Sequence, residues 1–351
     1  MRTGTILRTA ALGAVALMTA TACGGGEGGG AAETGGPAPA DPELTLVTGV
    51  YPLEWLAREI GGDRVAVVQL TEPGMEPHDL ELTARQIGEI TEADVAFYVS
   101  GLQPAVDEAV TQEASDKALD VADVVELHAA GEDGHDHEDE EDHGHEDDHA
   151  HEGDDHGHED EAEAEEDHED EGDGHEHGDF DPHFWLDVDL MAQVADALSA
   201  RLGELHPEGA DEYTANAEAV SAELATIGGE YEEGLASCEH REVVVGHTAF
   251  SYLTERYDLE QMGVSGVDPD TEPSPAQIAK IADFVEEHDV NTIFTEPLMP
   301  RATAETIAAE TGAEVEVLDP LEGVTDDSPG DDYPSIMRGN LEALRTALVC
   351  S

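Results

Sequence analysis

Four side chains able to ligate a metal ion follow short apolar segments of the sequence. His78 lies in the loop after the apolar run that ends at Leu70, and His183 lies in the stretch 181–187. His247 and Asp319 each come directly after a valine-rich run. Three imidazoles and one carboxylate form an N₃O set that Zn²⁺ accepts readily, because it has no ligand-field preference. A single histidine is more often a capped or solvated side chain, so residue type and position alone only suggest a site.

The segments that carry these residues alternate between strand-like and helix-like patterns. In the first half, strands are expected at 44–50, 64–70 and 94–100, and helices around 55–60 and 83–90. In the second half, strands are expected at 241–246, 291–295 and 314–318, and helices at 249–257, 274–288, 302–310 and 333–349. Short apolar strands that alternate with helices indicate parallel βαβ units, here in two α/β lobes.

The four candidate ligands come two from each half of the chain. Ligands of open α/β sheets bind beyond the carboxyl ends of the strands, so we expect the site in the cleft between the lobes. Between the halves, the stretch 211–235 has apolar residues at helical spacing and no strong breaker before Gly228-Gly229. Such a helix would be about 37 Å long, enough to run along both lobes. Because a helical connector is stiff, we expect little lobe closure.

The chain of 351 residues has 85 acidic and 13 basic residues and a formal net charge of −72. This balance excludes nucleic-acid binding through a basic face and argues against binding to anionic lipids by surface charge. No internal run reaches the roughly 18 apolar residues of a membrane helix. Any membrane attachment must therefore come from the N-terminus.

The N-terminus reads as an export signal over residues 1–22. Arg2 and Arg8 precede and flank a short apolar stretch, and small residues lead to Cys23. Cysteine after small residues resembles a bacterial lipoprotein cleavage site, which makes Cys23 the lipidated first residue; ordinary secretion is the alternative. The Gly-, Pro- and acid-rich stretch 23–41 cannot bury enough apolar area to fold, and we interpret it as a tether.

Export leaves two further cysteines, Cys238 and Cys350, in an oxidising compartment. A disulfide between them would clamp the last helix to the start of the second lobe. The alternative is two buried thiols, since sequence gives no distance between them.

Four stretches around the candidate ligands resemble the metal-binding solute-binding proteins of bacterial ABC importers, in the cluster that contains the zinc-uptake protein ZnuA. The stretches occur in the expected order, and the resemblance covers about residues 42–351; they are Glu76-Pro77-His78-Asp79-Leu80-Glu81, Asp181-Pro182-His183-Phe184-Trp185-Leu186-Asp187, Gly246-His247-Thr248-Ala249-Phe250-Ser251-Tyr252-Leu253 and Leu318-Asp319-Pro320-Leu321.

The resemblance implies two α/β lobes joined by a long helix, with the metal in the cleft between them. It implies boundaries at 42–187 for the first lobe, 188–237 for the helical connector and 238–351 for the second lobe. It also implies His78, His183, His247 and Asp319 as ligands. Histidine at the third position is similar to the zinc type, whereas glutamate there is similar to the manganese type, which agrees with the preference of carboxylates for Mn²⁺.

Two neighbours of these positions refine the resemblance. Some zinc-type members carry a glutamate immediately before the first histidine; here that residue is Pro77, so Asp319 matters more as the fourth ligand. Glu296 ends an expected strand, and we place it near the cleft, where it either supports a ligand or caps a helix or lobe contact.

Residues 131–179 hold 27 acidic residues, 11 histidines and no lysine or arginine. A segment of this composition is expected to be disordered without metal, and its His-x-His pairs to bind Zn²⁺ weakly. We interpret it as a low-affinity collector that passes zinc to the cleft; a solvated acidic run is the alternative. Its histidines are His135, His137, His143, His145, His149, His151, His156, His158, His168, His175 and His177.

The sequence therefore predicts a monomeric, lipid-anchored, extracytoplasmic zinc receptor that delivers Zn²⁺ to an ABC permease and its ATPase. No chemistry is expected, because four protein ligands leave no open position for a reactive water. Three alternatives stay open: a manganese or iron receptor, a zinc hydrolase that uses the same cleft, and a surface zinc buffer or adhesin that works through the loop alone.

Overall fold

The computed structural model describes residues 39, 41–129, 180–267, 269 and 273–351, which belong to one compact unit spanning 34–351. The predicted signal peptide, most of the predicted tether and all eleven histidines of the segment 131–179 lie outside the described residues. Within the described ranges, no helix combines the length and the apolar character needed to cross a bilayer.

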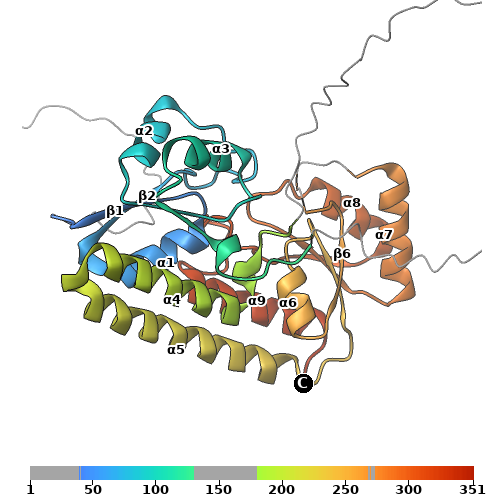
Figure 1. Ribbon diagram of the computed structural model, residues 1–351. Helices are drawn as coiled ribbons and strands as arrows, with labels where there is room; N and C mark the ends of the chain where they lie inside the picture. The colour runs from blue at the N-terminus through green and yellow to red at the C-terminus, as the bar shows by residue number, and fades with distance from the viewer. Residues whose placement is uncertain (1–38, 40, 130–179, 268, 270–272) are drawn as a thin grey trace, which may run out of the picture. The chain divides into compact units, whose positions relative to one another are not determined.

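Two four-stranded parallel sheets organise the chain (Figure 1). The N-terminal sheet has the order β2-β1-β3-β4, with β1 Leu44–Thr48, β2 Val65–Gln69, β3 Val95–Tyr98 and β4 Ala118–Asp120. The C-terminal sheet repeats this order as β6-β5-β7-β8, with β5 Glu242–Val245, β6 Glu260–Gly263, β7 Thr292–Thr295 and β8 Glu314–Val317. The two-lobe α/β fold predicted from the sequence is thereby confirmed.

Helices connect the strands and join the lobes. They are α1 Tyr51–Gly61, α2 Ala84–Glu92, α3 Pro104–Glu113, α4 Val188–Leu205, α5 Ala210–Leu235, α6 Ser251–Arg256, α7 Pro275–Glu287, α8 Ala302–Thr311 and α9 Tyr333–Ala347. Local sequence fixes several of their ends. Thr83 and Ser274 begin α2 and α7 with capping boxes, in which each hydroxyl accepts the backbone N–H three residues on. Gly312 ends α8 in the left-handed conformation that glycine tolerates.

The long connecting helix α5 confirms the prediction for 211–235. It has 26 residues and packs against α1 and α4 of the first half and against α9 of the second (Figure 1). Gly228-Gly229 does not interrupt it: Gly228 is buried, and a Cβ there would lie 3.1 Å from Val188. Gly228 therefore serves close packing between α5 and α4, whereas a Cβ on the exposed Gly229 would meet no atom within 4 Å.

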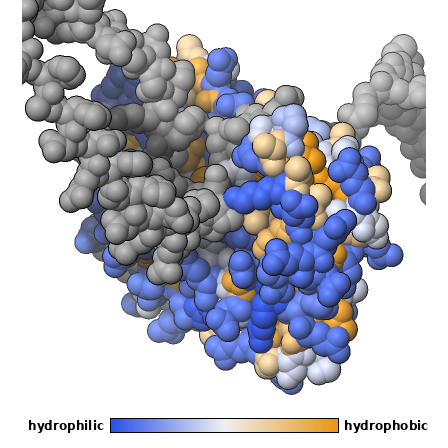
Figure 2. All heavy atoms as spheres, turned by 90° about the vertical axis from the view of Figure 1, so that its right-hand side faces the viewer, coloured by the Kyte–Doolittle hydropathy of each residue, from blue (hydrophilic) through white to orange (hydrophobic). Residues whose placement is uncertain are grey.

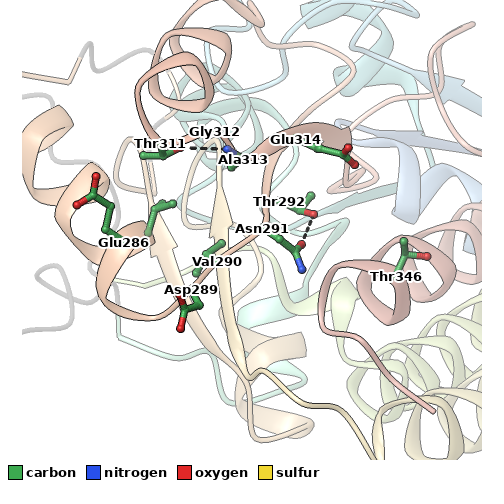
Figure 3. Close-up of a pocket in the computed structure, with 11 residues that line it drawn as sticks. Glu286, Asp289, Val290, Asn291, Thr292, Thr311, Gly312, Ala313, Glu314 and Thr346 are labelled. Carbon is green, nitrogen blue, oxygen red and sulfur yellow. Dashed lines mark hydrogen bonds between the residues drawn. The ribbon is translucent and has the colours of Figure 1, made fainter.

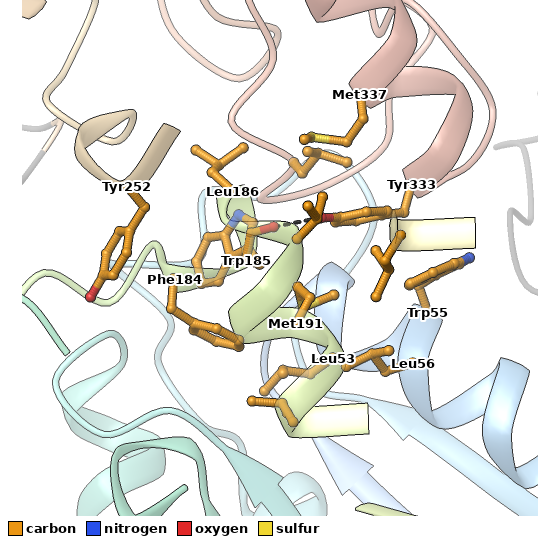
Figure 4. Close-up of a cluster of buried hydrophobic side chains, with 14 of the residues drawn as sticks. Leu53, Trp55, Leu56, Phe184, Trp185, Leu186, Met191, Tyr252, Tyr333 and Met337 are labelled. Carbon is orange, nitrogen blue, oxygen red and sulfur yellow. Dashed lines mark hydrogen bonds between the residues drawn. The ribbon is translucent and has the colours of Figure 1, made fainter. Parts of the chain in front are cut away.

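A continuous hydrophobic core passes beneath both sheets (Figure 4). Its centre is aromatic: Trp55 of α1 stacks on Tyr333 of α9 with ring centroids 4.7 Å apart, and the Tyr333 hydroxyl donates to the Trp185 carbonyl. Smaller clusters cover the other face of each sheet, around Ile90 in the first and Ile281 in the second. The shared core holds the two lobes together as one body.

Three elements were not predicted: α3, β4 and β6. Strand β4 has three residues, and β6 has the sequence Glu-Gln-Met-Gly, so neither is long or apolar enough to show a strand pattern. At the end of the second lobe, the structure joins Cys238 and Cys350 in a disulfide, with their Cα atoms 3.8 Å apart.

The surface of the C-terminal lobe is largely hydrophilic on the side formed by α7 and α8. Figure 2 views the side formed by α7 and α8, where hydrophilic side chains cover most of the visible described surface and smaller hydrophobic areas lie between them. Arg338 of α9 pairs with Glu223 and Glu230 of α5. Exposed pairs of this kind add little stability, so the buried core carries the fold.

Candidate metal centre

Three histidines and one glutamate converge on a single point in the described structure. The ligand atoms of His78, His183, His247 and Glu322 all lie within 4.8 Å of one another. The Oε1 atom of Glu322 lies 3.0 Å from Nε2 of His183, 3.2 Å from Nε2 of His247 and 3.3 Å from Nε2 of His78. The side chains of His183 and His247 are fully buried, that of Glu322 is 2% exposed and that of His78 is 12% exposed. The group is therefore reached from the His78 side.

The elements that carry these residues belong to both lobes. His78 lies in the loop between β2 and α2, and His247 directly follows β5 and Gly246. His183 precedes a short 3₁₀ turn that leads into α4, and Glu322 lies in the turn after β8. Three of the four thus come from loops beyond the carboxyl ends of parallel strands, as the sheet topology requires of a ligand site.

Two of the histidines are held by buried carboxylates. Oδ1 of Asp181 accepts the backbone N–H of His183 at 3.0 Å and contacts its Nδ1 at 2.7 Å. Glu296 does the same for His247, with Oε1 at 2.9 Å from the backbone nitrogen and Oε2 at 2.5 Å from Nδ1. A carboxylate at Nδ1 assigns the proton to that nitrogen, which leaves the Nε2 lone pair for a metal.

The site's charges are strongly coupled. Burial alone would lower the pKa of His183, but the carboxylates of Asp181 and Glu322 outweigh it and raise the pKa to about 8. Burial likewise opposes the shift at His247, where Glu296 and Glu322 hold the pKa well above its ordinary value. The imidazoles, in turn, overcome the burial of Glu322 and hold its pKa well below the usual range. Without a metal, protons on His183 and His247 therefore balance the negative charge of the carboxylates.

The loop that carries His78 is held through its backbone. The Nε2–H group of the buried Gln103 donates to the Pro77 carbonyl at 2.9 Å and to the Thr71 hydroxyl at 2.9 Å. A Cβ at Gly49 would lie 1.9 Å from Oε1 of Gln103, so a side chain at position 49 would displace this amide. His78 is thus placed by a neutral amide that bonds its neighbour and by Glu76, whose Oε1 accepts the His78 backbone N–H at 2.9 Å.

The donor set fits a tetrahedral cation. Four ligands about 2.0–2.1 Å from a zinc ion lie roughly 3.3 Å from one another, close to the 3.0–3.3 Å that separates Glu322 Oε1 from each Nε2. Three imidazoles and one carboxylate also match the chemistry of Zn²⁺ better than that of Mn²⁺ or Ca²⁺, which favour oxygen.

A family model described as the periplasmic zinc-uptake complex component A, ZnuA, matches residues 46–347. The chain belongs to the ZnuA family. The high-affinity zinc uptake system protein ZnuA of Bacillus subtilis is 30% identical over 342 residues, with 96% of each chain covered.

Two further relatives bear on the family's range. The zinc-binding lipoprotein AdcA of Streptococcus pneumoniae is 30% identical over 325 residues, which cover 87% of this chain and 56% of AdcA. This chain thus spans little more than half the length of that relative. The laminin-binding protein of Streptococcus agalactiae, described as a bifunctional protein with adhesin and metal transporting activity, has a TM-score of 0.68 and 28% identity over 87% of this chain and 99% of its own.

The fourth predicted ligand, Asp319, is not part of the group of converging ligand atoms. It is buried, its Oδ1 accepts the backbone N–H of Leu321 at 2.8 Å, and Glu322 takes the fourth position. Burial, with the nearby charges of Glu322 and Glu296, raises the pKa of Asp319 to about 6. The prediction chose the acidic residue at the end of the predicted strand. The chain instead makes a turn after Asp319, and the carboxylate that faces the histidines is that of Glu322.

Two site residues were not found by sequence reasoning. Glu322 is one of 85 acidic residues, and only its place three residues after Asp319 sets it apart. Asp181 lies two residues before His183, the spacing at which a carboxylate can bind both the backbone N–H and the ring of the same histidine. Glu296, which was expected near the cleft, lies against His247.

A separate cavity in the described structure lies elsewhere (Figure 3). Its volume is about 630 Å³, and its lining includes Asn291, Thr292 and Glu314 at the starts of β7 and β8, together with Glu286 and Asp289. The metal centre is beyond the opposite ends of these strands, and none of its four residues lines the cavity. The cavity therefore plays no part in the site.

Proposed function

We propose that this chain is an extracytoplasmic receptor that captures Zn²⁺ and delivers it to the permease of an ABC importer, which an ATPase drives. The convergence of three Nε2 atoms on one oxygen of Glu322 supports the proposal most directly. Membership of a zinc-uptake family agrees with it. The ion is cargo, so the site must hold zinc firmly and also release it when the permease docks.

We assign the zinc ligands as His78, His183, His247 and Glu322, with Asp181 and Glu296 orienting two of the imidazoles. These four ligands complete a tetrahedral shell and leave no position for an activated water, so this site is suited to binding rather than to hydrolysis. The three nitrogens favour zinc over manganese or iron.

Lipidation of Cys23 would place the receptor at the outer surface of the membrane, with 23–41 as a tether and the monomer free to meet its permease. A relative named as a zinc-binding lipoprotein supports this placement. We propose lobe limits of 42–187 and 238–351, with 188–237 as connector and 131–179 as an insertion in the first lobe.

The His-rich segment is proposed to collect zinc weakly and pass it to the centre. The described residues that flank it are close to the site, since Ala129 and Phe180 form an antiparallel bridge and the backbone N–H of Asp181 donates to the His128 carbonyl. Asp181 is the residue that orients His183. Ions released by the segment would thus be set free beside the metal centre.

The test compares the mature chain with a variant in which a short Gly/Ser linker replaces 131–179 across the Ala129–Phe180 bridge. Each is titrated with Zn²⁺ in the presence of competing Mn²⁺, and bound ions are counted. One tight zinc ion that Mn²⁺ does not displace is expected in both proteins, with extra weak ions only in the mature chain.

His183→Ala should abolish the tight ion, whereas His288→Ala, at the end of α7 and outside the group, should retain it. Preference for Mn²⁺ would identify a manganese receptor. A tight ion lost with the segment and retained in His183→Ala would identify a buffer or adhesin that works through the segment. Measurable peptidase or esterase turnover by the zinc-loaded protein would instead revive a hydrolase.

A further inference from the structure

The turn that presents Glu322 contains an unfavourable backbone conformation. Leu321, the residue before Glu322, has a φ of 64° and a fully buried side chain. Left-handed backbone is rarely adopted by residues other than glycine, asparagine and aspartate, because Cβ crowds the following carbonyl. Such a conformation persists only where the surroundings impose it. The carboxylate of Glu322 can be aimed at the histidines only if something holds this turn.

Asp319 provides the direct restraint on Leu321. Its Oδ1 accepts the Leu321 backbone N–H at 2.8 Å, an Asx-type turn in which a side chain takes the place of a backbone acceptor. Asp319 is itself fixed by the buried Asn340 of α9: the Asn340 Nδ2–H group donates to the Asp319 carbonyl at 2.7 Å, and Asn340 Oδ1 accepts the Asp319 N–H at 2.9 Å. Asn340 thus bonds both the backbone N–H and the carbonyl of Asp319.

Trp185 restrains Pro320, the residue of the turn between Asp319 and Leu321. Its Nε1–H group donates to the Pro320 carbonyl at 2.7 Å, and its own carbonyl accepts the Tyr333 hydroxyl at 2.6 Å (Figure 4). Trp185 lies two residues after the ligand His183. One aromatic side chain therefore connects the segment that carries His183 to the turn that carries Glu322.

We propose that Asp319 is a positioning residue, which holds Leu321 in the left-handed conformation and so directs Glu322 at the three histidines. The inference rests on the proposed zinc site and extends it to a residue outside the ligand group. In this role the side chain of Asp319 needs only an acceptor oxygen, because it acts through its bond to the Leu321 N–H. A residue that ligated zinc itself would instead depend on its negative charge.

The two roles separate in a series of variants of the mature chain, with zinc dissociation constants measured by chelator competition. Asp319→Asn keeps an acceptor oxygen, so its dissociation constant should stay within about threefold of the parent. Asp319→Ala removes the acceptor and should weaken zinc binding by about 10–100-fold, the range for residues that orient metal ligands. Glu322→Gln should weaken binding at least as much as Asp319→Ala.

The double variant Asp319→Ala/Glu322→Gln distinguishes positioning from a general structural effect. If Asp319 acts through Glu322, the double variant should bind zinc no more weakly than Glu322→Gln alone, whereas an independent role predicts additive losses. The visible spectrum of bound Co²⁺ gives a second readout. Asp319→Asn should keep the parent's spectrum, and Asp319→Ala should shift it toward that of Glu322→Gln.

Several results would overturn the proposal. An Asp319→Asn variant as weak as Glu322→Gln would make Asp319 a ligand, and an Asp319→Ala variant that binds like the parent would remove its role. If Asp319→Ala does not fold, the comparison of Asp319→Asn with Glu322→Gln still decides between the two roles. Failure of the parent protein to bind zinc would count against the proposed function, which distinguishes that failure from these.

Discussion

The buried histidines and His78 are held in different ways. His183 and His247 are fully buried, and each has a carboxylate on Nδ1 and on its own backbone N–H. His78 is partly exposed; Glu76 Oε1 accepts its backbone N–H at 2.9 Å, and Gln103 donates to the carbonyl of the preceding residue. The centre therefore combines a rigid, charge-stabilised part with one adaptable ligand. An ion that must be both bound and released is expected to enter and leave through the His78 side.

The largest effect should follow from removing a rigid ligand. His247→Ala deletes one donor and leaves Glu296 buried without its partner, and unpaired buried charges cost about 3–5 kcal/mol. We expect loss of tight zinc binding together with a lower melting temperature of the metal-free protein. His78→Ala should weaken zinc binding with little change in melting temperature. Equal destabilisation by both changes, in calorimetric melts, would remove the distinction between the two parts.

The second largest effect should come from removing the charge of the carboxylates that contact Nδ1 of His183 and His247. Asp181→Asn and Glu296→Gln keep the size of each side chain but remove its charge, so zinc affinity should fall by about 10–100-fold. Calorimetric titration of both variants measures the change. A matched control is Asp187→Asn, since Asp187 caps α4 and pairs with Arg256 outside the site. Losses no greater than that of the control would mean that the carboxylates only support the fold.

The third effect concerns pH. The pKa of His183 is about 8, above its ordinary 6.5, so the protonated ring stabilises the metal-free fold fully below about 6.5. That contribution is lost as the pH rises through about 8. Zinc competes with this proton, so zinc affinity and the rise in melting temperature caused by zinc should both increase from pH 6.5 to 8.

Calorimetry in buffers of different ionisation enthalpy should show proton release on zinc binding at pH 7. Release should be smaller in Asp181→Asn, because the pKa of His183 falls when that carboxylate loses its charge. Binding without proton release at pH 7 would contradict the account of the rigid part.

The smallest effect should come from the support of His78. Gln103→Ala removes the bond to the Pro77 carbonyl, and Gly49→Ala displaces the same amide by contact with Oε1. We expect each to speed zinc release several-fold in stopped-flow chelator experiments, with a smaller change in equilibrium affinity. Gly88→Ala is a suitable control, because a Cβ there meets no atom within 4 Å. Unchanged release rates would show that the loop holds His78 without Gln103.

Sequence patterns predicted the fold well because its signals are local. Valine-rich strands such as β5 and capped helices such as α7 carry their periodicity and their capping residues within a few positions. The site was predicted only in part, because its decisive features are not local. Because Leu321 is left-handed, Glu322 rather than Asp319 presents its carboxylate to the histidines. Asn340 and Trp185, which lie far away in the chain, bond to this turn.

The central claim is that one zinc ion is held by His78, His183, His247 and Glu322. A crystal structure of the zinc-loaded mature chain, with anomalous diffraction measured on both sides of the zinc absorption edge, tests it most directly. We predict one strong anomalous peak with three Nε2 atoms and a Glu322 oxygen about 2.0–2.2 Å away, and with Asp319 still bound to the Leu321 N–H. A peak coordinated by Asp319, or a strongest peak away from these histidines, would contradict the account.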